Sequence, residues 1–188
     1  RETAGDSARA VYLPDRVNPM LPERISNELC SLRPNEDKLT FSAVFKINNR
    51  AEVKDYWLGK TVIHSDHRFT YEDVQQMIED DADGAYQEEI LLLNKLAQIL
   101  RGKRFENGAI SFTSQEVRFK LDEKAKPVGI IVKESKEAHQ LIEEFMLLAN
   151  RTVAEHVAKA NNKKPLPFPY RIHDTPDEQK LLPFVAFA

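Results

Sequence analysis

A long amphipathic segment, Lys136 to Ala160, constrains the fold of this chain more than any other part of the sequence. At about 100° per residue, its side chains divide into three stripes along a helix. One stripe is apolar, a second is polar and charged, and a third mixes polar and apolar residues. The spacing predicts one long helix, capped by Ser135, whose apolar stripe packs against other elements.

The three stripes place two neighbouring glutamates in different settings. The apolar stripe consists of Ala138, Leu141, Ile142, Phe145, Leu148, Ala149 and Thr152. The solvated stripe consists of Gln140, Glu144, Arg151 and Glu155, and the mixed stripe of His139, Glu143, Met146 and Asn150. We expect Glu144 to be solvated. Glu143 is set apart from the surface acids and is a candidate functional residue, although a lone helix glutamate is usually solvated.

Two pairs of alternating segments predict antiparallel hairpins. Apolar and polar residues alternate from Leu39 to Ile47, as in a half-buried strand, and Val53 to His64 follows after a turn at 48–50. Val117 to Leu121 and Val128 to Val132 flank a second turn. We expect the Leu39, Phe41, Ala43, Phe45 and Ile47 side of the first strand to face the interior.

Two further helices are predicted between the hairpins. Thr70 resembles an N-cap and Asp73 follows three residues later, so a helix should begin near Tyr71. Gln87 to Arg101 has helical spacing, with Gly102 or Gly108 as its stop. Together the elements predict an α+β fold in which antiparallel β-hairpins pack against helices.

Composition limits the kinds of partner that this chain can have. With 188 residues, of which 41% are hydrophobic, the chain fits one domain with a real core. The formal net charge of −3 gives no overall basic field, so any nucleic-acid site must be local. The local cations are Arg16, Arg101, Lys103 and Arg104. No membrane partner is expected, since no apolar run is long enough to span a bilayer.

The single cysteine, Cys30, fits a reducing cytoplasm because it has no partner for an internal disulfide. It lies among leucines without a nearby histidine, which predicts a buried thiol rather than a nucleophile. A metal site built on His64 and His67 lacks a third ligand. The acids Asp80, Asp81 and Asp83 do not follow the calcium-loop pattern and predict solvated surface.

Prolines stiffen the stretch from Tyr12 to Asp37. Pro14 and Pro19 favour an extended loop, whereas Pro22 suits the first position of a short helix that Pro34 ends. One interpretation is a rigid connection in which Leu21, Leu29 and Cys30 are buried. The other is a stiff loop that holds Tyr12 and Arg16 ready for a ligand, because a preordered loop loses less entropy on binding.

Four motifs in order carry a resemblance to a known family. They read "VYLPDRVNPMLPERISNELCSLRPNEDKLTFS", "TVIHSDHRFTYEDVQ", "RGKRFENGAISF" and "AHQLIEEFMLLANRTVAEHV". Over about Arg9 to His173 the chain resembles the RNB catalytic domain of the ribonuclease II and ribonuclease R family, and is most similar to the bacterial ribonuclease R version. Members are hydrolytic exoribonucleases that degrade RNA from its 3' end.

The resemblance implies roles for particular residues. Aromatic residues at the positions of Tyr12 and Phe112 pack against bases of single-stranded RNA, which is worth about 1–3 kcal/mol per base and tolerates any sequence. The tyrosine matching Tyr71 lies near the scissile phosphate and helps to set the length of the final product. The glutamate matching Glu143 belongs to the surroundings of the active site. Arg16 is the expected cation beside Tyr12.

The resemblance also implies what this stretch lacks. The family's metal-binding aspartates lie upstream of Tyr12, and an arginine near the active site lies downstream of residue 188. The chain begins at Arg1 and ends on an apolar run, Leu181 to Ala188, which indicates an excised piece. We expect residues 1–188 to be the central part of one RNB exoribonuclease domain, and to bind no metal and hydrolyse nothing alone.

Two functions stay open on this basis. The first is a monomeric cytoplasmic exoribonuclease that uses Mg²⁺ in the full-length protein and releases nucleoside 5'-monophosphates processively. The second is an RNB-like scaffold that binds RNA or regulates but has lost catalysis. An intact or degraded aspartate cluster upstream would separate the two.

Overall fold

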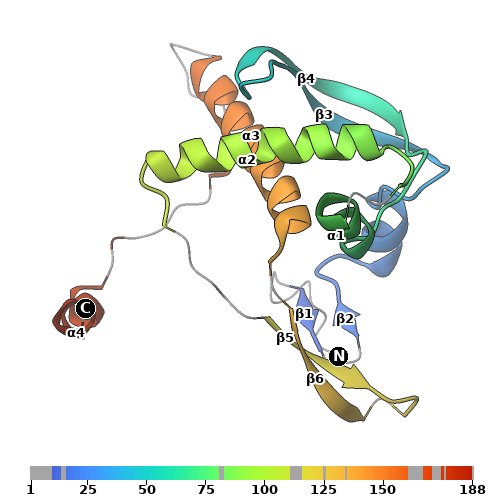
Figure 1. Ribbon diagram of the computed structural model, residues 1–188, viewed down its shortest axis with the longest axis vertical. Coiled ribbons are helices and arrows are strands. Elements are labelled where there is room, and N and C mark those ends of the chain that lie inside the picture. The colour runs from blue at the N-terminus through green and yellow to red at the C-terminus, as the bar shows by residue number, and fades with distance from the viewer. Residues whose placement is uncertain are drawn as a thin grey trace. The chain divides into compact units, whose positions relative to one another are not determined.

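The computed structural model describes residues 10–13, 16–80, 83–110, 116–124, 126–133, 135–160, 167–170, 175 and 177–187. The chain divides into two compact units, Arg1–Arg151 and Thr152–Ala188. Small antiparallel hairpins alternate with helices, as predicted for the α+β class (Figure 1). No helix in the described ranges is long and apolar enough to cross a membrane.

The elements follow one another in a simple order along the chain. They are β1 (Val11–Tyr12), β2 (Val17–Asn18), the π-helix η1 (Arg24–Leu29), β3 (Asp37–Ile47), β4 (Val53–His64), α1 (Tyr71–Asp80), α2 (Gln87–Glu106), β5 (Glu116–Leu121), β6 (Pro127–Lys133), α3 (Glu137–Lys159) and α4 (Glu178–Phe187). The strands pair as β1–β2, β3–β4 and β5–β6, each antiparallel. Both predicted hairpins are therefore confirmed, as is the long helix.

Asn48 builds the turn of the β3–β4 hairpin. Its side-chain oxygen accepts hydrogen bonds from the backbone N–H groups of Arg50 and Glu52, each at 3.0 Å. Ala51 has a positive φ of 53°, which completes the reversal. The local hydrogen bonds of an asparagine side chain thus fix the turn that the sequence predicts.

The predicted burial of β3 is wrong over its first half. Leu39 is 86% exposed and Phe41 is 69% exposed. On the other face, the hydroxyl of Thr61 lies 2.6 Å from those of both Thr40 and Ser42. These hydroxyls satisfy one another, so their partial burial costs little, and a polar cluster takes the more covered face.

Helix α2 ends just before the second of its two candidate glycines. Helix α2 continues through Gly102, and the chain turns at Asn107 and Gly108, whose φ is 91°. Gly102 as the stop is therefore wrong and Gly108 is right, because a single glycine inside a helix costs only about 1 kcal/mol. The buried apolar residues include Ile90 and Ala97 on α2 and Ala138 and Leu141 on α3.

The proline-rich stretch forms two short structures. Tyr12 pairs with Val17 in the β1–β2 hairpin, and the N–H of Cys30 donates to the carbonyl of Ile25 at 2.9 Å, closing η1. Leu21 and Leu29 are exposed, and so is Cys30. The interpretation that buries these three residues, including the predicted buried thiol, is wrong. The short helix turns its apolar residues outward.

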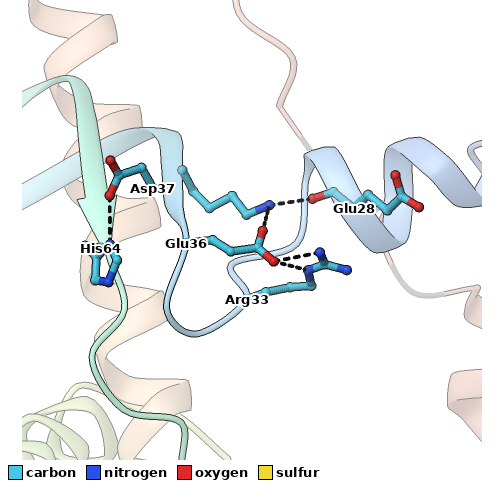
Figure 2. Close-up of polar contacts among 6 residues, drawn as sticks. Glu28, Arg33, Glu36, Asp37 and His64 are labelled. Atoms are coloured by element: carbon cyan, nitrogen blue, oxygen red, sulfur yellow. Dashed lines mark hydrogen bonds and ion pairs between the residues drawn. The ribbon is translucent and has the colours of Figure 1, made fainter.

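A surface network ties the segment after η1 to the start of β3 (Figure 2). Glu36 lies 2.6 Å from both Arg33 and Lys38, and Lys38 also donates to the carbonyl of Glu28 at 3.1 Å. These bonds hold the pKa of Glu36 below its usual range, first through Lys38 and then through Arg33. Because the side chains of Arg33 and Glu36 are solvent-exposed, the network orients the segment more than it stabilises the fold.

Candidate functional site

A reciprocal cap fixes Tyr71 at the first position of α1. The N–H of Asp73 donates to the Thr70 hydroxyl at 3.1 Å, and the N–H of Thr70 donates to the Asp73 carboxylate at 3.2 Å. The predicted capping box is confirmed. The hydroxyl and N–H of Thr70 favour the carboxylate form and so lower the pKa of Asp73. The start of α1, and with it Tyr71, therefore has a defined position.

Removing this cap gives a testable change in stability. Thr70→Ala is expected to lower the free energy of unfolding by about 1 kcal/mol, measured by chemical denaturation. The lowered pKa of Asp73 means that its contribution is complete above the ordinary aspartate pKa. That contribution is lost as the pH falls through the lower native value. Asp73→Asn should therefore destabilise the protein at neutral pH and much less in acid.

Glu72→Gln is the matched control because Glu72 also lies in the first turn of α1. It shares the helix dipole with Asp73 but has no part in the capping box, so its pH dependence should be much smaller. Equal profiles for Asp73→Asn and Glu72→Gln would show that the cap contributes nothing of its own.

The ring of Tyr71 stacks on His139 of α3. The two ring centroids are 4.1 Å apart and the planes differ by 8°. Tyr71 nevertheless stays 39% exposed, so part of the residue is accessible to a ligand. Tyr71 and His139 thus form one aromatic surface although they are far apart in the sequence.

Helix α3 continues that surface toward Glu143. His139 and Glu143 are one helical turn apart and therefore share a face of α3. We call Tyr71, His139 and Glu143 the α1–α3 row. The row joins both predicted catalytic residues, Tyr71 and Glu143, through a histidine of the mixed stripe.

Two polar contacts hold the N-terminus of α3 to the other helices. The buried side chain of Gln75 on α1 accepts a hydrogen bond from the N–H of Ala138 at 3.0 Å. Asn94 on α2 donates to Glu137 at 3.0 Å. The first bond satisfies an N–H that lies at the open end of the helix. Both bonds fix the position of the start of α3 relative to α1 and α2, and with it the position of His139.

Arg104 on α2 reaches across to both glutamates of α3. Its Nε and Nη2 lie 3.0 and 2.6 Å from Glu144 Oε1, and Nη2 is also 3.1 Å from Glu143 Oε1. The hydrogen bonds and charge of Glu144 raise the pKa of Arg104 above its usual value. Glu144 is only 3% exposed, whereas the side chain of Glu143 is 47% exposed. The guanidinium thus neutralises the buried Glu144 and also contacts the solvent-exposed Glu143.

The buried position of Glu144 corrects the prediction that it is solvated. Helical spacing assigns it to the charged stripe, but the ion pair with Arg104 allows a carboxylate to be buried there. The same contact changes the expected basic patch. Arg104 binds both acids, Arg101 Nη1 lies 3.9 Å from Glu144, and Lys103 donates to the carbonyl of Arg50 at 2.7 Å. Arg101 and Arg104 are therefore not independent phosphate-binding cations.

A pocket of about 560 Å³ lies beside this ion pair. Its lining includes Lys103, Arg104, Asn107, Glu144 and Arg151. Gly108, Ala109 and leucines of α2 and α3 form the rest of its wall, so the lining combines apolar and charged residues.

The predicted RNA-binding residues are placed only in part. Tyr12 is 79% exposed in the β1–β2 hairpin, as a residue that stacks on a base must be. The carbonyl of Arg16 accepts the N–H of Leu13 at 2.8 Å and closes the same hairpin. Phe112 lies outside the described residues. No recorded contact within the described ranges joins Tyr12 to the α1–α3 row.

Sequence reasoning missed His139 and Arg104 as members of this site. His139 was detectable because it precedes Glu143 by four residues in the mixed stripe. Nothing in the sequence pairs Arg104 with Glu144 across two helices. Among the described residues, no three His, Cys, Asp or Glu side chains gather as metal ligands.

Comparison with known proteins gives consistent matches over nearly the whole chain. The sequence matches the family model described as "RNB domain" over residues 1–188. DIS3-like exonuclease 2 from Caenorhabditis elegans is 40% identical over an alignment of 172 residues, and the match covers 83% of this chain and 20% of that protein. Ribonuclease R 2 from Lactococcus lactis is 36% identical over 187 residues, 95% of this chain and 28% of that protein.

A solved structure supports the fold as well. Mycoplasma genitalium RNase R, in complex with ribose methylated single-stranded RNA, matches with a TM-score of 0.81 at 29% identity. The match covers 98% of this chain and 29% of that one. The chain thus spans less than a third of the length of each of these proteins.

Proposed function

The chain belongs to the RNB domain family, and from this membership we propose that it is the central part of a 3'-to-5' exoribonuclease that hydrolyses single-stranded RNA. The relatives named ribonuclease R and DIS3-like exonuclease 2 support an exoribonuclease. The RNA-bound RNase R of similar fold supports RNA as the ligand. We further propose a processive, cytoplasmic, monomeric enzyme that yields nucleoside 5'-monophosphates.

One observation carries this proposal. Tyr71 and Glu143 come from separate motifs of the chain, and α1 and α3 bring them into one row through His139. The row offers a stacking surface at one end and a partly exposed carboxylate at the other. This arrangement suits the 3' end of a single strand, in which a base packs on a ring and the backbone passes a polar group.

The hydrolysis itself requires an activated water and stabilisation of negative charge on the phosphate. The resemblance implies Mg²⁺, which would supply both of these effects when bound. We propose that carboxylates outside this chain hold that ion. The residues of this chain bind and orient the strand. Tyr71 lies near the phosphate that is cleaved, Glu143 borders it, and Tyr12 and Phe112 stack on bases.

An activity assay tests the proposal. The natural protein that contains this sequence is incubated with Mg²⁺ and uniformly labelled single-stranded RNA, in parallel with the 188-residue chain alone. We expect the natural protein to release nucleoside 5'-monophosphates from the 3' end and the chain alone to release none. Release by the chain alone would contradict the assignment of the metal site. RNA binding without release by the natural protein would instead support the scaffold function.

Tyr12 provides a separate test of RNA binding. Tyr12→Ala in the natural protein is expected to weaken binding of single-stranded RNA by about 1–3 kcal/mol, or roughly 5-fold to 150-fold, measured by fluorescence anisotropy without divalent metal. Tyr12→Phe is the matched control, since it keeps the ring and should bind nearly as tightly. The same loss is expected for Phe112→Ala. Unchanged affinity in both alanine variants would exclude the stacking role.

A further inference from the structure

Arg104 makes unequal contacts with two adjacent glutamates. Glu144 receives hydrogen bonds from both Nε and Nη2, whereas Glu143 receives one, from Nη2 at 3.1 Å. Glu144 is buried and Glu143 is open to solvent. The buried Glu144 therefore depends on Arg104 for charge neutralisation, whereas the exposed Glu143 does not.

The buried acid fixes the arginine. A buried carboxylate needs a charged, hydrogen-bonded partner, so the guanidinium cannot leave Glu144 without a large cost. The guanidinium is planar and its donors point in fixed directions. Once two of them bind Glu144, Nη2 has a set position beside Glu143. The orientation of the exposed carboxylate is thus determined by a contact with its buried neighbour.

We infer that Arg104 is a positioning residue that holds the Glu143 carboxylate in the α1–α3 row, with Glu144 as its buried anchor. This inference rests on the proposed function, in which Glu143 borders the reacting phosphate. Arg104 acts through Glu143 and need not touch RNA. An exposed glutamate without this contact would sample several rotamers, and a displacement of about 1 Å near the chemistry can lower turnover up to about 100-fold.

Arg104→Lys in the natural protein is the first test. Lysine keeps a positive charge for Glu144 but lacks the planar set of N–H donors that binds both glutamates at once. We expect the kcat for single-stranded RNA to fall about tenfold while KM changes less than about twofold, since positioning affects the chemical step more than binding. A thermal melt of the same sample shows that the variant is folded. The control, Lys95→Gln, alters an exposed cation of the same helix and should keep the native kcat.

A double-mutant cycle with Glu143→Gln shows whether Arg104 acts through Glu143. In the Glu143→Gln background, Arg104→Lys should lower kcat by less than about twofold further, because the group that it positions is already altered. A full tenfold loss in both backgrounds would overturn the inference, as would a native kcat for Arg104→Lys or for Glu143→Gln. If the unmodified natural protein releases no nucleotide, the proposed function fails instead.

A double variant tests the inference even if Arg104→Lys fails to fold. The pair Arg104→Gln and Glu144→Gln removes both buried charges and keeps an amide hydrogen bond between the two helices. It supplies no second donor fixed beside Glu143, so we expect the same loss of about tenfold in kcat. A native kcat in this folded double variant would overturn the inference.

Discussion

Replacing Arg104 with alanine is expected to lower the free energy of unfolding by about 3 kcal/mol, because it leaves the Glu144 carboxylate buried without a cation. Glu144 is 3% exposed, and its Oε1 lies 2.6 Å from Nη2 of Arg104. The side chain of Arg101 lies 3.9 Å away and replaces little of that interaction. Urea denaturation followed by circular dichroism measures the change.

Two controls separate this effect from a general loss of helix stability. Lys95→Ala removes an exposed cation from the same helix and should cost less than about 0.5 kcal/mol. The pair Arg104→Met and Glu144→Leu should be more stable than Arg104→Ala alone, since it buries no unpaired charge. If Arg104→Ala costs no more than Lys95→Ala, the ion pair does not hold α2 to α3.

Replacing Tyr71 with alanine is expected to lengthen the shortest RNA product of the natural protein. The ring, supported from one side by His139, is proposed to retain short RNA near the cleaved phosphate. Loss of one stacking contact costs about 1–3 kcal/mol, so the shortest products should dissociate roughly 5-fold to 150-fold more readily before their final cleavage. Denaturing electrophoresis of 5'-labelled RNA measures the end product.

Tyr86→Ala is a matched control for this change. Tyr86 also lies near a histidine, with its ring centroid 6.0 Å from that of His67, but it has no recorded contact with the α1–α3 row. Its removal should leave the end product at its native length. His139→Ala should lengthen the product as Tyr71→Ala does, because the supporting ring is lost. An unchanged end product in both Tyr71→Ala and His139→Ala would contradict the placement of Tyr71.

Local signals in the sequence predicted most of the elements. The β3–β4 hairpin, the start of α1 at Thr70 and the long α3 follow from alternation, capping chemistry and helical spacing, which depend on neighbouring residues. The exposure of Leu39 did not follow, because the face that a strand buries depends on what packs against it. Helix α4 was also missed, since Pro183 argues against a helix there.

Single residues of the candidate site were predictable, but the contacts between its elements were not. Glu143 stood out from its helix, and Tyr71 came from a resemblance between motifs. The partner of each comes from another part of the chain: His139 for Tyr71, and Arg104 for Glu143. Helical spacing also misplaced Glu144, because it cannot show that a cation from α2 lies opposite. Contacts between helices decide both the burial and the role of these residues.

Crosslinking tests the central claim most directly, namely that α1 and α3 together receive the 3' end of one RNA strand. The natural protein is mixed with single-stranded RNA that carries 4-thiouridine as its last nucleotide, without divalent metal, and is irradiated and digested for mass spectrometry. The account predicts crosslinks to Tyr71 or His139, and their loss when the photoreactive nucleotide is placed at the 5' end. Crosslinks from the 3' end that fall only on the β3–β4 hairpin or on α4 would contradict it.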